Sequence, residues 1–133
     1  MAESKAIILC VDDEENPLML RKLVLQKAGY GVITAKSAEE ALGIMGARQV
    51  DLVLSDQLMP GKTGVELARQ IKAEHPAVAV ILLSGVNEIP PGADWADAFL
   101  SKLEGPDSLC REIEALLNAG AAERHSHSVP PAF

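Results

Sequence analysis

The stretch LVLSDQLMPGKTG, from Leu52 to Gly64, decides the fold that we predict for this chain. It begins with an apolar run that lacks polar alternation, which is typical of a strand buried on both faces. The run stops at Asp56, and the Met-Pro-Gly that follows predicts a turn. Apolar residues at helical spacing then predict a helix from Val65 to His75. Asp56 is therefore expected where a strand ends before a helix, which is where open α/β sheets collect their chemistry.

The rest of the chain repeats this alternation of apolar runs and helical patterns. Further strands are predicted at residues 6–11, 30–35, 78–83 and 98–100, and further helices at 16–29, 37–46 and 106–120. Apolar strands that alternate with helices indicate a parallel sheet covered on both faces. We therefore predict an α/β fold, a doubly wound five-stranded parallel sheet in the flavodoxin-like order 2-1-3-4-5.

One helix of this pattern is expected to be short. Pro90-Pro91-Gly92 interrupts the segment after the fourth strand and leaves room for at most a turn or two of helix. Gly120 is predicted to close the last helix, and the small, polar and proline-bearing residues beyond it predict a loose end. The expected organisation is one domain at 1–120 and a flexible C-terminal tail at 121–133.

Composition excludes several classes of function. The chain has 133 residues and a formal charge of -7, and its Lys and Arg residues are scattered among acids, which argues against a nucleic-acid surface. No signal peptide and no apolar run of membrane length is evident in the sequence. Cys10 and Cys110 lie in apolar or helical patterns, so they are interpreted as small hydrophobes rather than as a disulfide framework. A cytoplasmic location is expected.

Polar residues gather at the predicted carboxyl ends of the strands. In the order 2-1-3-4-5 the loops after strands one and three are neighbours, so Asp12, Asp13 and Asp56 are expected to share one crevice. Ser84 and Lys102 follow strands four and five at the same edge. Close carboxylates repel one another by about 4 kcal/mol for each pair at an effective dielectric near 20, so the cluster requires cations. Lys102 supplies one, and Mg²⁺ with its preference for oxygen ligands is the natural second.

This arrangement predicts a site for a phosphoryl group. Asp56 would attack a phosphodonor in line and become an acyl phosphate. Mg²⁺ and Lys102 would hold the phosphoryl oxygens, and the Ser84 hydroxyl would donate to another of them.

These residues resemble the receiver domains of two-component response regulators, and the chain is similar to the chemotaxis response regulator in size and layout. The resemblance covers about residues 5–119, and it rests on the acidic pair after strand one, Asp56 with the following Met-Pro-Gly, Ser84 with its small neighbour, Phe99 and Lys102. It implies a phosphorelay signalling domain whose only enzymatic activities are its own phosphorylation and dephosphorylation. A sensor histidine kinase or phosphotransfer protein would phosphorylate Asp56, and the output partner is left unnamed.

The same resemblance implies a role for each matching residue. Asp13 would bind Mg²⁺ directly together with Asp56, Asp12 would act largely through water, and the backbone carbonyl of Leu58 would complete the protein ligands. Ser84 and Phe99 would form the switch pair, in which the hydroxyl moves toward the phosphoryl group and the ring turns inward behind it. The surface around the fourth helix, fifth strand and fifth helix of the family fold would then change.

The chain departs from the family pattern at three places. Leu103 follows Lys102 where the family usually has proline, so the sequence leaves the aim of the ammonium group undetermined. The segment with Pro90-Pro91 is several residues shorter than usual. Leu58 and Val86 are apolar at positions that flank the phosphoryl group in the family. Since neither side chain readily orients a water molecule, slow dephosphorylation is predicted.

Two other functions fit parts of this pattern. Leu103 and the short fourth helix are compatible with a phosphorylation-independent interaction module on the same fold. An aspartyl-phosphate phosphohydrolase is disfavoured because such enzymes typically carry a second acid two residues after the nucleophile, and this chain has Leu58 there. Affinity for Mg²⁺ distinguishes the phosphorylation-independent module from the phosphorylation switch. Turnover of a phosphomonoester would identify the phosphohydrolase.

Overall fold

The computed structural model describes residues 6–85 and 90–127 as an α/β domain, with side chains described as far as residue 119. Its elements in chain order are β1 (Ile7–Val11), α1 (Glu15–Lys27), β2 (Gly31–Ala35), α2 (Ala38–Ala47), β3 (Leu52–Asp56), α3 (Gly64–Glu74), β4 (Ala79–Ser84), the 3-10 helix η1 (Ala93–Trp95), β5 (Ala98–Ser101) and α4 (Pro106–His127). The predicted alternation of strands and helices is confirmed. Most of the boundaries are shifted by one or two residues from the predicted ones.

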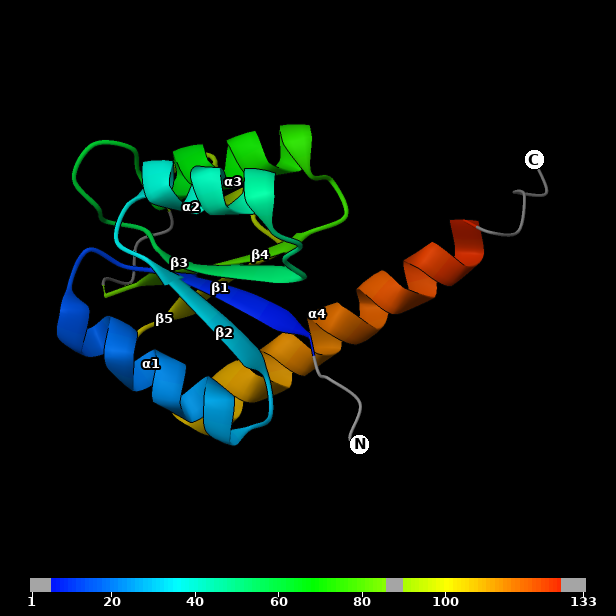
Figure 1. Ribbon diagram of the computed structural model, residues 1–133, viewed down its shortest axis with the longest axis horizontal. Helices are drawn as coiled ribbons and strands as arrows, with labels where there is room; N and C mark the ends of the chain where they lie inside the picture. The colour runs from blue at the N-terminus through cyan, green and yellow to red at the C-terminus, as the bar shows by residue number, and fades with distance from the viewer. Residues whose placement is uncertain (1–5, 86–89, 128–133) are drawn as a thin grey trace.

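The five strands form one parallel sheet in the order β2-β1-β3-β4-β5, as predicted. Figure 1 shows α2 and α3 on one face of the sheet and α1 with the first half of α4 on the other. The strand order places β1 beside β3, so the loops that follow these two strands open at the same edge.

Each face of the sheet has its own apolar core, because successive side chains of a strand point to opposite faces. Leu9 and Val53 point toward α2 and α3, and they pack in one cluster with Leu67 and Ile71. The opposite cluster contains Leu18 and Leu25 of α1 and Ile113 of α4, together with the alternate residues of the central strands. Both faces are buried, which explains why the strands read as continuous apolar runs.

Cys10 belongs to the core that α1 and α4 cover, and its side chain is fully buried. Burial raises the pKa of the Cys10 thiol to about 12, so the group stays protonated at neutral pH. Neither Cys10 nor Cys110 forms a disulfide. The interpretation of the two cysteines as small hydrophobes rather than a disulfide is confirmed.

Two helices begin at side-chain caps. Ser37 accepts a hydrogen bond from the backbone N–H of Glu40, whereas the Glu40 carboxylate accepts from the N–H of Lys36 rather than from that of Ser37, so no capping box forms there. The full capping box lies at α3, where Thr63 and Glu66 each accept from the backbone of the other. This cap starts α3 directly after the turn that follows Asp56.

The described residues between β4 and β5 contain little helix, as the two prolines predicted. Residues 90–97 hold one 3-10 turn, η1, and residues 86–89 lie outside the described part of the chain. Gly92 precedes η1 with φ of 84°, a left-handed conformation that glycine adopts without strain. For the residues that the structure describes, the prediction that the helix between β4 and β5 is shortened is therefore confirmed.

The last helix is longer than the sequence predicted. α4 continues through Gly120 to His127, and its second half extends beyond the sheet in Figure 1. The prediction that Gly120 closes this helix is wrong, because a helical glycine costs only about 1 kcal/mol and alanines surround this one. Residues 128–133 lie outside the described residues, and the flexibility predicted for residues 121–133 stays a prediction.

Candidate functional site

Asp56 is the last residue of β3, and its side chain lies at the carboxyl edge of the sheet. The residue is 3% exposed. The next residue, Gln57, forms hydrogen bonds to two neighbouring elements. Its N–H donates to the carbonyl of Leu83 at 2.8 Å, and its side-chain Oε1 accepts from the N–H of Val65 at 2.8 Å. Gln57 therefore connects the end of β3 to β4 and to the start of α3, which fixes the backbone that carries Asp56.

Two more acids meet Asp56 at this edge. Asp12 directly follows β1 and is fully buried, whereas Asp13 is exposed. One ligand oxygen from each of Asp12, Asp13 and Asp56 lies within 4.8 Å of the others. The predicted meeting of these three carboxylates is confirmed, because the strand order makes β1 and β3 neighbours.

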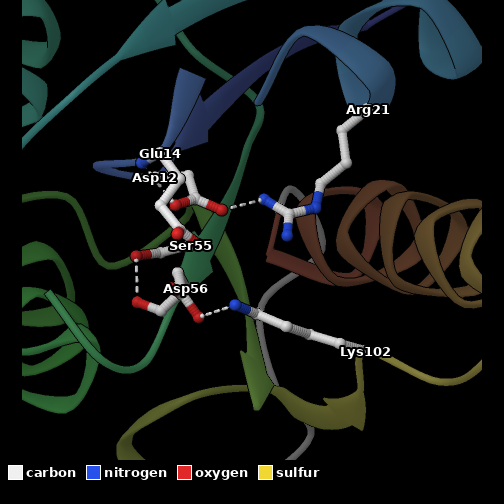
Figure 2. Close-up of polar contacts among 6 residues, drawn as sticks. All are labelled: Asp12, Glu14, Arg21, Ser55, Asp56 and Lys102. Atoms are coloured by element: carbon white, nitrogen blue, oxygen red, sulfur yellow. Dashed lines mark hydrogen bonds and ion pairs between the residues drawn. The ribbon is translucent and has the colours of Figure 1, made fainter. Parts of the chain in front are cut away.

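Among the described residues, two cations form ion pairs with the buried acids of this cluster (Figure 2). Lys102 Nζ lies 2.9 Å from Asp56 Oδ1, and Arg21 Nη1 lies 2.8 Å from Asp12 Oδ2. Asp12 Oδ1 also accepts a hydrogen bond from the backbone N–H of Glu14 at 2.9 Å. With all of these groups ionised, the three carboxylates and two cations leave one net negative charge, so the repulsion between the acids is largely compensated.

Arg21 is not among the site residues that the sequence pattern predicted. The residue lies on α1 between Leu18 and Leu25, whose side chains are buried in the core. A charged residue three positions after one core leucine and four before the next breaks the apolar face of a helix. That break was the signal available in the sequence, because a cation at such a position requires a buried partner.

Lys102 reaches Asp56 although Leu103 follows it. The N–H of Lys102 donates to the carbonyl of Ser84 at 2.8 Å, which continues the pairing of β4 with β5. The Ser101 hydroxyl accepts from the N–H of Leu103 at 3.0 Å and holds the turn after β5. These contacts aim the ammonium group, whereas Leu103 itself is 86% exposed.

The remaining predicted residues lie around the cluster. Ser84 ends β4 and is 2% exposed, and Phe99 of β5 is half-buried and packs against the core beneath α2 and α3. The side chain of Leu58, two residues after Asp56, is exposed. Val86 lies outside the described residues. The metal-ligand role of the Leu58 carbonyl and the switch roles of Ser84 and Phe99 stay predictions.

A groove of about 420 Å³ opens beside the ion pairs, between α1 and the start of α4. Arg21 and Lys102 both line it, together with Leu20, Leu83 and Leu100. The groove thus combines an apolar wall with the two cations that contact the buried acids.

The family of this chain follows from comparison with known proteins. The sequence model of the response regulator receiver domain matches residues 8–114. The chain therefore belongs to the receiver domain family of two-component response regulators, which is a family of signalling domains rather than of classical enzymes.

Individual relatives agree with this assignment. The chain is 34% identical over 125 residues to the transcriptional regulatory protein GlrR of Escherichia coli, an alignment that covers 91% of this chain and 28% of GlrR. It is 32% identical over 116 residues to the phosphate regulon regulator PhoB of Pseudomonas aeruginosa, which covers 83% of this chain and 51% of PhoB. The chain thus spans about a quarter to a half of the length of these curated relatives.

Among solved structures, the chain is similar to the response regulator TrrA of Thermotoga maritima, crystallised in complex with Mg²⁺ and BeF. The TM-score is 0.80 at 34% sequence identity, and the match covers 84% of this chain and 99% of that one. Within residues 6–85 and 90–127 of the present chain, no helix has the length and apolar character that a membrane span requires.

Proposed function

We propose that this chain is a phosphorylation switch in which Asp56 accepts a phosphoryl group from a sensor histidine kinase or phosphotransfer protein. The observation that carries the proposal is the setting of Asp56: it is buried, paired with Lys102 at 2.9 Å and grouped with two further carboxylates within 4.8 Å. This combination of acids and a cation suits a group that carries negative charge into the site.

Mg²⁺ fits the donor set at this edge of the sheet. Hard divalent cations prefer carboxylate and carbonyl oxygens, and three carboxylate oxygens lie together here. We assign Asp13 and Asp56 as direct ligands, Asp12 as a ligand that acts largely through water, and the Leu58 carbonyl as the remaining protein ligand. When bound, Mg²⁺ would neutralise negative charge on the phosphoryl oxygens.

The transfer step uses the carboxylate of Asp56. Lys102 contacts Oδ1, so Oδ2 is the candidate nucleophile. It attacks phosphorus in line, the phosphorus–oxygen bond forms, and the bond from phosphorus to the donor's leaving atom breaks with its electron pair. Lys102 lies where its ammonium group can neutralise the phosphoryl oxygens, and the Ser84 hydroxyl donates to one of them. The chain thus catalyses only its own phosphorylation and dephosphorylation.

The switch would pass from the phosphoryl group to the surface through Ser84 and Phe99. Ser84 ends β4, and Phe99 lies on the neighbouring strand, where it pairs with Leu82. Movement of the hydroxyl toward the phosphoryl group leaves space that the half-buried ring of Phe99 enters. The contacts of η1 and β5 with an output partner would then change. The kinase, the output partner and a cytoplasmic location belong to this proposal.

Intact mass after incubation with acetyl phosphate tests the proposal. We expect one added phosphoryl group in the presence of Mg²⁺ and little or none when EDTA replaces the metal, because the negative donor must approach a negative cluster. Far-UV circular dichroism on the same samples shows whether the protein is folded. A folded protein that gains no mass under any condition would instead indicate the phosphorylation-independent interaction module.

The phosphorylated form is expected to persist for minutes or longer after acetyl phosphate is removed. Leu58 lies two residues after Asp56 and has an apolar, 64% exposed side chain, so it does not orient an attacking water. Leu58→Asn should shorten the lifetime severalfold, whereas Leu23→Asn, at an exposed leucine on α1, should leave it unchanged. The decay of the phosphorylated mass with time measures this. A wild-type lifetime of only seconds would contradict the prediction.

The contact between Lys102 and Asp56 weakens the case for a phosphorylation-independent module. That alternative rested on Leu103, which left the aim of Lys102 undetermined, and on the shortened helix between β4 and β5. With the ammonium group 2.9 Å from Asp56, only the short helix still favours it. A short helix changes the surface that a partner contacts, and it leaves the acidic cluster intact.

A further inference from the structure

Arg21 occupies a position on α1 that faces the sheet rather than the solvent. Leu18 and Leu25 lie one turn away on either side and are buried in the core, and the Arg21 side chain is only 13% exposed. It lines the same groove as Lys102. Burying a charged side chain at such a position costs desolvation free energy. We therefore expect the ion pair that Arg21 forms to affect the properties of the site.

The partner of Arg21 is the buried member of the acidic cluster. Asp12 is fully buried and receives Arg21 on Oδ2 and the N–H of Glu14 on Oδ1. Figure 2 shows the guanidinium group and the Lys102 ammonium group approaching the cluster from α1 and from the end of β5. Each of the two buried acids, Asp12 and Asp56, therefore already has one cation.

We propose that Arg21 is a resident counter-cation of the acidic pocket: it holds Asp12 in the absence of metal and thereby lowers the affinity of the pocket for Mg²⁺. The inference rests on the Mg²⁺ site of the proposed function. An arginine stays protonated at all accessible pH values, so its charge opposes that of a second cation under every working condition. Asp12 is the shared partner, since the guanidinium group and the metal would both draw on the same carboxylate.

The resident cation would also allow the pocket to stay stable without metal. A buried carboxylate that loses its only charged partner is strongly destabilising. With Arg21 in place, Asp12 is compensated whether or not Mg²⁺ is bound. Without Arg21, the folded state would depend on Mg²⁺ to compensate Asp12, so stability and metal concentration would become linked.

The variant Arg21→Gln tests the proposal, because glutamine keeps a hydrogen-bond donor and removes the charge. Isothermal titration of the folded protein with MgCl₂ should show binding about tenfold tighter or more than in the wild type. The melting temperature in EDTA should fall, and its rise on adding Mg²⁺ should exceed the rise in the wild type. Both readouts are independent of phosphorylation.

Two further variants show whether the change in Mg²⁺ affinity depends on the positive charge that is paired with Asp12. Lys36→Gln removes a cation from an exposed ion pair of the same 2.8 Å length, between Lys36 and Glu15, and should change Mg²⁺ affinity by less than about threefold because solvent screens it. Arg21→Lys keeps the charge and should bind Mg²⁺ within about threefold of the wild type.

The outcomes distinguish this inference from the proposed function. If the wild type binds Mg²⁺ and folded Arg21→Gln binds it no more tightly, the inference is wrong and the metal site stands. Equal tightening in Lys36→Gln would also overturn it, since the effect would then be one of net charge. If neither the wild type nor Arg21→Gln binds Mg²⁺, both the metal site and the inference fail.

Discussion

Asp56→Asn is expected to abolish phosphorylation by acetyl phosphate while leaving the domain folded. The substitution keeps the shape of the side chain but replaces the carboxylate nucleophile with an amide, which does not form a stable acyl phosphate. It also removes one of three close carboxylates, so their repulsion falls. We therefore expect stability in EDTA to match or exceed that of the wild type, which separates lost chemistry from lost folding.

Ser55→Ala is the matched control for this variant. Ser55 is buried next to Asp56 and carries a hydroxyl that donates to the Asp56 carbonyl at 2.9 Å, so it is the nearest alternative phosphoacceptor in the chain sequence. Intact mass should show one added phosphoryl group in Ser55→Ala and none in Asp56→Asn. Hydroxylamine should remove the group, as expected of an acyl phosphate. Mass addition that persists in Asp56→Asn would rule out Asp56 as the acceptor.

Gly64→Ala is expected to destabilise the domain and to slow phosphorylation together. Gly64 begins α3, and a Cβ atom there would lie 2.6 Å from the carbonyl oxygen of Asp56 and 2.9 Å from Cα of Gln57. Both neighbours are backbone atoms, so the end of β3 and the start of α3 must separate. We expect a loss of about 1–3 kcal/mol in the free energy of unfolding, typical of overpacking. Displacement of Asp56 from Lys102 should lower the phosphorylation rate.

Gly43→Ala provides the comparison for Gly64→Ala. Gly43 lies in α2, and an added Cβ would meet nothing within 4 Å. The same substitution there should stabilise the domain by up to about 1 kcal/mol, because alanine favours a helix more than glycine does. Urea unfolding measures both variants. Equal stability of Gly64→Ala and the wild type would show that the close approach of α3 to Asp56 is not required.

The amino-acid sequence by itself determined the elements and their order. Continuous apolar runs identified the strands, helical spacing and caps identified the helices, and the alternation of the two led to the parallel sheet 2-1-3-4-5. The meeting of Asp12, Asp13 and Asp56 followed from that order, because each acid ends or follows a strand. These properties depend on local pattern and on topology, both of which can be inferred from the order of residues in the sequence.

Only the tertiary structure decided the contacts that cross between elements. The partner of Arg21 depends on how α1 is rotated against the sheet, and the aim of Lys102 depends on hydrogen bonds to Ser84 and Ser101 that substitute for the missing proline. The extension of α4 beyond Gly120 was likewise undecided, since a single glycine changes helix stability by too little to end a helix among alanines. In each case the outcome depends on contacts or continuity beyond the local sequence pattern, which that pattern alone does not specify.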